Sequence, residues 1–256
     1  MPQKKRQMHL AVFWLGTGNH SAGWRMPGAS SSNCDWSVAV AGARAAERGK
    51  FDLFFISDGL VFDPGDHPSF ITRFEPTTLI SALGAVTTHI GLGATVSTSF
   101  SEPYTVARTF NRIQHLSGGR AAWNIVTTSN DKAAQNFNRG VLNEHDQRYE
   151  IANEFVDAVR GLWNCWDEGA IVRNPQTGAF LDQTKVRSLD YKGRFFSVKG
   201  PVNMERSEHG HPVLIQAGGS PPGQELSART ADVVFAVVNG DRVSAKAAYD
   251  SLKARV

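Results

Sequence analysis

The sequence predicts an α/β protein built around a parallel sheet. Short apolar runs alternate along the chain with stretches of helical length, and a single alternation of this kind is typical of an α/β fold. Residues 51–56 (FDLFFI) are apolar almost throughout, as in a parallel strand that is buried on both faces. Six strand–helix units can be counted, whereas eight would close a (β/α)8 barrel of about 250 residues. A barrel without its last units and an open, doubly wound sheet therefore both fit the pattern.

The first units lie in the N-terminal third of the chain. Residues 10–15 form a short apolar run that glycine ends, and such a run predicts a strand. Asp35 is placed to cap a helix that runs to about residue 48. After the next strand, at residues 51–56, Glu75 and Pro76 open a second helix, because proline is tolerated in the first turn.

The middle of the chain continues the same pattern. Residues 90–97 and 120–127 are apolar runs typical of strands, and residues 103–116 between them carry apolar side chains at helical spacing. A long helix is predicted over residues 144–166, where apolar residues form one stripe.

The alternation of strands and helices is interrupted at residues 174–201, which are rich in Gly, Pro, Asp and Lys. We predict that this segment is an insertion that extends a loop over a pocket. The alternation then resumes with strands at residues 212–217 and 232–238 and helices at residues 221–231 and 241–255. Residues 1–256 are therefore expected to form one domain.

The composition is that of an ordinary globular enzyme. Hydrophobic residues make up 41% and charged residues 20% of the chain, which excludes a disordered protein. The net charge of +3 is too small to indicate nucleic acid or an anionic membrane as a partner, and no apolar run approaches the ~20 residues of a membrane helix. Cys34 and Cys165 lie too far apart in the sequence for a disulfide framework. We expect a cytoplasmic protein with reduced thiols.

Several familiar motifs are incomplete or missing. Gly16 and Gly18 follow the first predicted strand, but the third glycine of a dinucleotide-binding turn is lacking. The sequence contains neither a P-loop nor an HExxH motif. His209 and His211 are interpreted as surface histidines of a loop, so no metal site is predicted.

Residues 218–222 (GGSPP) lie between a predicted strand and a predicted helix. Ser220 would cap the helix, whose first turn offers free N–H groups and partial positive charge to a phosphate. Pro221 and Pro222 remove two of those donors, so an anion would also need the amides of Gly219 and Ser220 and side chains from elsewhere. A plain Ser-Pro helix cap explains the motif equally well.

Other polar residues occur at positions where they could complete such a site. His145 and Tyr149 are four apart near the start of the long helix and share one face, although a solvated histidine and a packed tyrosine explain them as well. Asp58 directly follows the second strand, Thr95 lies near the end of the third, and Asn124 lies within the fourth. Taken together, these three place polar groups at the carboxyl ends of consecutive strands, where barrel enzymes carry their active sites.

Several stretches of the sequence are similar to one family of enzymes. They are residues 19–25 (NHSAGWR), 45–52 (AAERGKFD), 118–127 (GGRAAWNIVT) and 216–220 (QAGGS). From about residue 9 to residue 238, the chain resembles the bacterial luciferase-like flavin monooxygenases. The resemblance is strongest to the branch of nitrilotriacetate monooxygenase component A, EDTA monooxygenase, dibenzothiophene-sulfone monooxygenase and pristinamycin IIA synthase, of which residues 118–127 are typical.

The resemblance implies a (β/α)8 barrel that binds reduced FMN (FMNH2), which a separate NAD(P)H:flavin reductase delivers. It also implies a monooxygenase that inserts one atom of O2 into a small organic substrate through a C4a-peroxyflavin, and a chain that forms a homo-oligomer. Ser220, Tyr149 and His145, with the amide of Gly219, are the residues expected at the phosphate. Asp58, Thr95 and Asn124 are those expected at the flavin ring or the ribityl chain. His20 is expected to act as a catalytic residue in the substrate pocket.

Family members continue through two more strand–helix units, so this chain is expected to lack the last units of the barrel. Two other functions therefore stay open. The missing units suggest a non-catalytic flavin-binding protein or truncated paralogue. A deazaflavin-dependent oxidoreductase of the same superfamily is the second alternative, against which the stretch at residues 118–127 argues.

Overall fold

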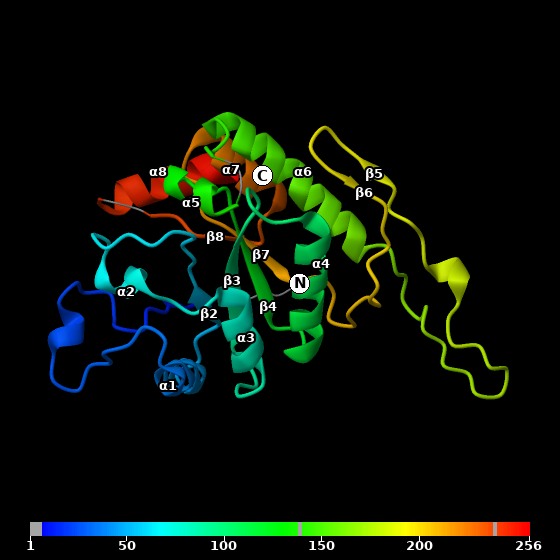
Figure 1. The fold of residues 1–256 in the computed structure, drawn as a ribbon, viewed down its shortest axis with the longest axis horizontal. Helices are drawn as coiled ribbons and strands as arrows, with labels where there is room; N and C mark the ends of the chain where they lie inside the picture. Colours follow the sequence, from blue (N-terminus) through cyan, green and yellow to red (C-terminus); the bar gives the residue numbers. More distant parts are fainter. Residues whose placement is uncertain (1–6, 138–139, 238–239) are drawn as a thin grey trace.

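The computed structural model describes residues 7–137, 140–237 and 240–256, and a six-stranded parallel sheet forms its centre (Figure 1). The strands follow one another across the sheet in their order along the chain. They are β1 (Ala11–Phe13), β2 (Leu53–Ile56), β3 (Gly91–Ser97), β4 (Ala121–Val126), β7 (Val213–Gln216) and β8 (Val233–Val234). A doubly wound sheet reverses its strand order at one point, so this sheet has the winding of a barrel wall instead.

All six predicted helices form. They are α1 (Trp36–Arg48), α3 (Pro76–Gly84), α4 (Pro103–Leu116), α6 (His145–Trp163), α7 (Pro221–Thr230) and α8 (Arg242–Lys253). Two short helices, α2 (Pro68–Ile71) and α5 (Asp131–Ala134), lie in the connections. The predicted cap at Asp35 is confirmed, because its carboxylate accepts hydrogen bonds from the amides of Ser37 and Val38.

The sheet is curled. Phe13 ends β1 at one edge and Phe235 follows β8 at the other, yet their ring centroids are only 6.2 Å apart. Phe55 of β2 also stacks on Phe235, at 6.1 Å. The predicted α/β class is therefore confirmed as a curled, parallel, six-stranded sheet. The described residues do not show closure into an eight-stranded barrel.

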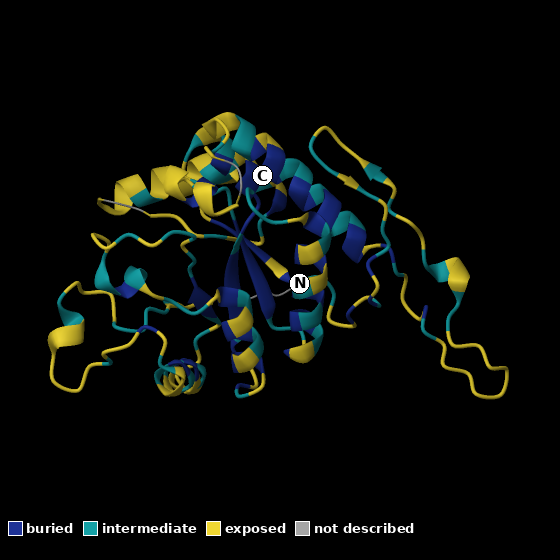
Figure 2. Ribbon diagram, in the orientation of Figure 1, coloured by how far each residue is buried: buried dark blue, intermediate teal, exposed yellow. Residues whose placement is uncertain are grey.

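The main core lies between the outer face of the sheet and the helices, where the buried residues gather (Figure 2). Trp123 of β4 is fully buried there, with the rings of Phe110 and Phe155 at centroid distances of 5.8 and 5.9 Å. The inner face carries a smaller apolar cluster of Phe55, Ala122 and Ile215. This helix-covered outer wall supports the strands and leaves their carboxyl ends free for a site.

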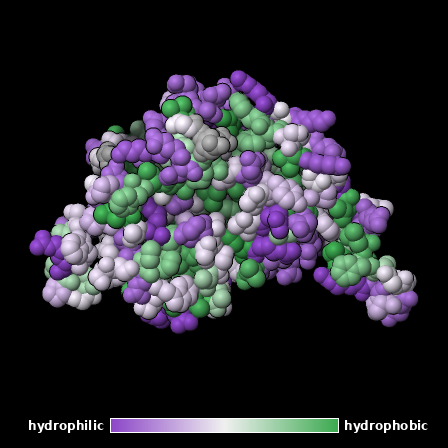
Figure 3. Space-filling model, viewed as in Figure 1, coloured by the Kyte–Doolittle hydropathy of each residue, from purple (hydrophilic) through white to green (hydrophobic). Residues whose placement is uncertain are grey.

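The prediction that residues 174–201 extend over the pocket is wrong. This segment, here called the arm, contains the two-stranded sheet of β5 (Tyr191–Lys192) and β6 (Ser197–Val198) and projects to one side of α6 (Figure 1). The Glu154 carboxylate of α6 accepts hydrogen bonds from the consecutive amides of Arg194, Phe195 and Phe196, at 3.0, 2.9 and 2.7 Å. The arm is therefore fastened to the outside of the helix layer. Hydrophobic residues show on its surface in Figure 3. Phe180 of the arm is 64% exposed.

The predicted ends of some elements differ from those in the structure. Residues 10–15 and 232–238 are predicted as strands, but β1 has three residues and β8 has two. These two are the edge strands of the sheet in the part of the chain that the structure describes. Val238 lies outside the described residues. The helix predicted to reach residue 166 ends at Trp163, and Trp166 pairs with Val186 of the arm instead. Among the residues described, no helix combines the length and the apolar character that crossing a membrane requires.

Two charged side chains hold the amino ends of the strands together. Arg120, just before β4, is half-buried, and its guanidinium group donates to oxygens of three short segments. These acceptors are the carbonyls of Ser117, Gly84, Thr87 and Ile90 and the hydroxyl of Thr87. The Glu47 carboxylate of α1 accepts from the amides of Thr88, His89 and Ile90, and these hydrogen bonds hold its pKa below the usual value despite the opposing effect of burial.

Candidate functional site

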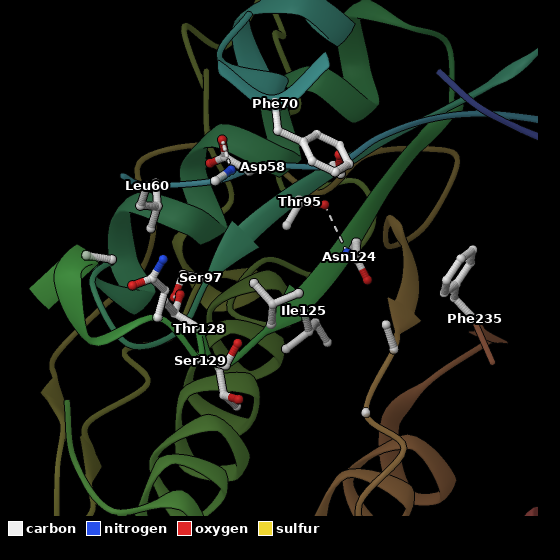
Figure 4. Close-up of a pocket in the computed structure, with 18 of the residues that line it drawn as sticks. Asp58, Leu60, Phe70, Thr95, Ser97, Asn124, Ile125, Thr128, Ser129 and Phe235 are labelled. Carbon is white, nitrogen blue, oxygen red and sulfur yellow. Dashed lines mark hydrogen bonds between the residues drawn. The ribbon is translucent and has the colours of Figure 1, made fainter. Parts of the chain in front are cut away.

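A cavity of about 540 Å³ opens at the carboxyl ends of the strands (Figure 4). Its walls come from segments that are far apart in the sequence. They are Phe13, Phe55, residues 57–61, Asp66, Phe70, Arg73, Thr95, Ser97, residues 124–130, Ala133, Tyr149, residues 216–218 and Phe235. The volume lies within the range of about 300–1,000 Å³ that is typical of small-molecule sites.

The structure brings most of the predicted site residues together. Four of the eight line the cavity, namely Asp58, Thr95, Asn124 and Tyr149. Gly219 and Ser220 belong to the loop against which Tyr149 packs, and His145 lies beside the Tyr149 ring. His20 is the exception, as described below.

Thr95 and Asn124 form a hydrogen-bonded pair inside the cavity. They are direct neighbours in the register of β3 and β4, and each side chain is 4% exposed. The Thr95 hydroxyl donates to the Ile56 carbonyl at 2.9 Å and accepts from the Asn124 amide nitrogen at 2.9 Å. The Oδ1 atom of Asn124 is buried and has no hydrogen-bond partner within the described chain. The cavity wall therefore contains an unsatisfied acceptor.

Asp58 and Arg73 lie at another part of the wall. Burial raises the pKa of the Asp58 carboxyl, although the Gly59 amide, at 2.8 Å, and the charge of Arg73 act in the opposite direction. The Arg73 guanidinium lies over the Phe70 ring and donates to the Phe70 carbonyl at 2.9 Å. It also packs on Gly59, where a Cβ would lie 2.9 Å from the guanidinium carbon. Asp58 thus has a cation nearby, while burial favours its neutral form.

Tyr149 and the loop from β7 to α7 form a third part of the site. A Cβ at Gly218 would lie 2.9 Å from the Tyr149 hydroxyl and 2.7 Å from the Gly223 Cα, so the loop and the phenol are in close contact. Ser220 caps α7, and its hydroxyl accepts from the Gly223 amide at 3.4 Å. A Cβ at Gly219 would meet nothing within 4 Å, so this glycine borders open space. The Tyr149 hydroxyl and the open Gly219 loop therefore come together here. The first turn of α7 has no free amide, because positions 221 and 222 are prolines and the amides of Gly223 and Gln224 bond Ser220.

The two predicted histidines lie outside the cavity wall. His145 begins α6, its ring centroid is 5.1 Å from that of Tyr149, and its Nδ1 lies 2.8 Å from the Asp146 carboxylate. His20 is exposed in the loop after β1, where its Nδ1 accepts a hydrogen bond from the Ala22 amide at 3.1 Å. The structure does not bring His20 into the cavity. Its catalytic role stays a prediction.

Sequence reasoning missed three cavity residues. Arg73 lies in a polar loop, and nothing in its spacing marks it. Gln216 could have been found, because it is the one polar residue at the end of the apolar run 212–217. Its Oε1 accepts from the Gly218 amide at 2.6 Å and from the Ser227 hydroxyl, and so fixes the loop. Thr128 has a φ of 47° and bonds Ser97 through the two hydroxyls at 2.6 Å, which no sequence pattern indicates.

The family model for luciferase-like monooxygenases matches residues 13–256. The chain is 48% identical over 256 residues to N-acetyl-S-(2-succino)cysteine monooxygenase of Bacillus subtilis (strain 168), covering 99% of this chain and 57% of that protein. It is 38% identical over 266 residues to nitrilotriacetate monooxygenase component A of Aminobacter aminovorans, covering 98% and 58%. The chain therefore spans a little over half the length of these relatives.

Solved structures agree with these matches. The crystal structure of a long-chain alkane monooxygenase superposes with a TM-score of 0.90 at 31% identity, over 98% of this chain and 61% of that one. A riboflavin lyase with modified FMN and riboflavin superposes with a TM-score of 0.88 at 29% identity, over 98% and 58%. The curled sheet is thus shared with enzymes of this kind.

Proposed function

The chain belongs to the luciferase-like monooxygenase family, and from this membership we propose that it is the oxygenase component of a two-component system that uses reduced FMN. In this proposal it inserts one atom of O2 into a small organic substrate. The observation that carries the proposal is the convergence of Asp58, Thr95, Asn124 and Tyr149, from four separate segments, on one cavity at the carboxyl ends of the strands.

The residues present fit a flavin mononucleotide. A phosphate needs hydrogen-bond donors, and the Tyr149 hydroxyl and the open Gly219 backbone offer them at one end of the cavity. The first turn of α7 adds its partial positive charge but no free amide, because it begins with two prolines and its next two amides bond Ser220. A flavin ring also carries N–H groups, which need acceptors, and the unpaired Oδ1 of Asn124 is such an acceptor. Small-molecule sites combine apolar walls with a few placed polar groups in this way.

Each residue then has one role. Ser220, Tyr149, His145 and the Gly219 amide would hold the phosphate. The ring or the ribityl chain would be contacted by Asp58, Thr95 and Asn124. Water would be excluded from the ring by the aromatic side chains of Phe13, Phe55 and Phe235. Bound reduced flavin would supply the electrons that activate O2, while the protein positions the reactants. His20 is proposed to act on the substrate, for which the loop that carries it would have to move towards the cavity.

The electrons would come from a separate NAD(P)H:flavin reductase. The name of one relative, component A of nitrilotriacetate monooxygenase, implies a system of more than one protein and supports this proposal. The relatives are named for substrates as different as nitrilotriacetate and N-acetyl-S-(2-succino)cysteine. We therefore propose a small organic molecule as the substrate class and no particular compound.

Anaerobic titration of the protein with reduced FMN tests the proposal directly. Binding should be saturable, as followed by flavin fluorescence, and admission of O2 should yield oxygen consumption that depends on the protein. The deazaflavin alternative predicts hydride transfer without oxygen consumption. A non-catalytic paralogue predicts tight binding of oxidised FMN without turnover. A chain that binds no reduced flavin contradicts all catalytic forms of the proposal.

A further inference from the structure

The carboxamide of Asn124 can adopt only one orientation. The Thr95 hydroxyl has a single hydrogen, which it donates to the Ile56 carbonyl at 2.9 Å. Towards Asn124 it can therefore only accept, so the amide nitrogen of Asn124 must face it, at 2.9 Å. The Oδ1 atom is consequently turned away from Thr95, as the close-up shows (Figure 4).

This orientation presents an acceptor and not a donor. Asn124 is 4% exposed and lines the cavity, and its Oδ1 has no partner among the described residues. A buried acceptor without a donor destabilises the fold, so such a group is satisfied by a ligand in many functional sites. The ligand must then bring an N–H or O–H group to this point.

We infer that Asn124, held by Thr95, selects the redox state of the flavin: its Oδ1 accepts a hydrogen bond from the N5–H group, which reduced FMN carries and oxidised FMN lacks. This inference rests on the proposed function. In oxidised FMN the N5 atom is itself an acceptor, so two lone pairs would face each other and the acceptor would stay unsatisfied. A site built for a hydrogen-bond donor rejects the analogue that lacks it.

The surroundings of Asn124 favour N5–H over N3–H, the ring donor that both redox states carry. The N3–H group is flanked by two carbonyl oxygens, which need donors of their own. Beside Asn124, the Thr95 hydrogen is used at Ile56, and the same face of the sheet carries the apolar cluster of Phe55, Ala122 and Ile215. The N5–H group has a carbonyl on one side and an aromatic C–H on the other, which suits this mixed environment.

Two substitutions and one matched control test the inference. The readout is the ratio of the dissociation constants for FMN and for FMNH2, from aerobic and anaerobic fluorescence titrations. Asn124→Leu should weaken FMNH2 binding about tenfold without weakening FMN binding. Thr95→Val removes the hydroxyl that fixes the amide, which can then turn its nitrogen towards oxidised N5, so FMN binding should improve. Thr95→Ser keeps the hydroxyl and should keep the ratio.

The midpoint potential of bound flavin gives a second readout. A tenfold fall in the ratio, which means loss of selection for the reduced form, should lower the two-electron midpoint potential by about 30 mV. Equal weakening of both redox states in Asn124→Leu, as N3–H contact predicts, overturns the inference and leaves the proposed function standing. An unchanged ratio in Thr95→Val also overturns it, and decides the matter if Asn124→Leu does not fold. Wild-type protein that binds neither form overturns the proposed function and the inference with it.

Discussion

The Tyr149 hydroxyl lies against Gly218 so closely that a Cβ on this glycine would be 2.9 Å from the oxygen. The two residues belong to α6 and to the loop after β7, which are joined at this point by contact alone. The hydroxyl reaches the loop because residue 218 has no side chain. Both residues line the cavity, so this contact determines the shape of one of its ends.

The neighbouring glycines provide a matched pair for testing this contact. Gly218→Ala would place a Cβ 2.7 Å from the Gly223 Cα, and overpacking of this kind lowers the free energy of unfolding by about 1–3 kcal/mol. Gly219→Ala would meet nothing within 4 Å and should leave stability nearly unchanged. Urea unfolding of both variants measures the difference, and equal stabilities would show that the loop can move away from Tyr149.

Removing the hydroxyl groups at this end should weaken flavin binding through the phosphate. Ser220→Ala and Tyr149→Phe each remove one hydrogen bond to a charged group, which is worth about 1.5–3 kcal/mol. FMN titrations should show this loss, whereas riboflavin, which has no phosphate, should bind each variant as it binds the wild type. A loss of thermal stability without a loss of FMN affinity would mean that Tyr149 serves packing and that the phosphate lies elsewhere.

Asp58 should make stability depend on pH. Burial raises the pKa of its carboxyl above the ordinary value of 3.8, so the folded state binds the proton more tightly than the unfolded chain. The free energy of unfolding therefore falls as the pH rises above 3.8, because ionisation of the buried carboxyl destabilises the folded state. Below pH 3.8 the carboxyl is protonated in both states and this destabilisation is absent. Asp58→Asn should raise the free energy of unfolding relative to wild type at pH 7 but not at pH 3. Urea midpoints at the two pH values measure this, and a gain that is equal at both would contradict the assignment.

Arg120 should be irreplaceable by lysine. Its guanidinium serves five acceptors at the amino ends of the strands, whereas a lysine has three donors and leaves buried oxygens unpaired. Arg120→Lys should lower the free energy of unfolding by about 2–4 kcal/mol without a change in the denaturant slope.

Arg112→Lys is the matched control for this substitution, because the polar contact of Arg112 among the described residues is an exposed ion pair with Glu205 at 4.0 Å. Its effect should stay within about 0.5 kcal/mol. If both variants lose the same free energy of unfolding, the five hydrogen bonds of Arg120 stabilise the fold no more than the exposed ion pair of Arg112 does.

Local signals predicted those parts of the fold that depend on neighbours in sequence. The cap at Asp35 and the start of α3 at Pro76 follow from side-chain chemistry within a single turn. The polar groups at the ends of β2, β3 and β4 came together because parallel strands share one carboxyl edge. These features needed no knowledge of the distant chain.

Features that depend on distant partners could not be predicted in this way. The position of the arm depends on Glu154, which is about forty residues away from the amides it binds. Arg73 reaches the cavity wall because Gly59 leaves room for it, and neither residue signals the other in the sequence. His20 lies in residues 19–25, one of the stretches that carry the family resemblance, and is therefore expected in the substrate pocket. The structure places it in an exposed loop outside the cavity.

The separation of Arg120 and Glu47 from the cavity has a consequence for how this molecule can change. Both side chains fasten the amino ends of the strands, while the cavity is built by segments beyond the carboxyl ends. Substitutions in the loop residues 60–61 or 129–130, which also line the cavity, therefore leave the hydrogen bonds of Arg120 and Glu47 intact, so new chemistry can be introduced there at little risk to folding. The same fold can in this way accept many different compounds through changes in its cavity loops alone.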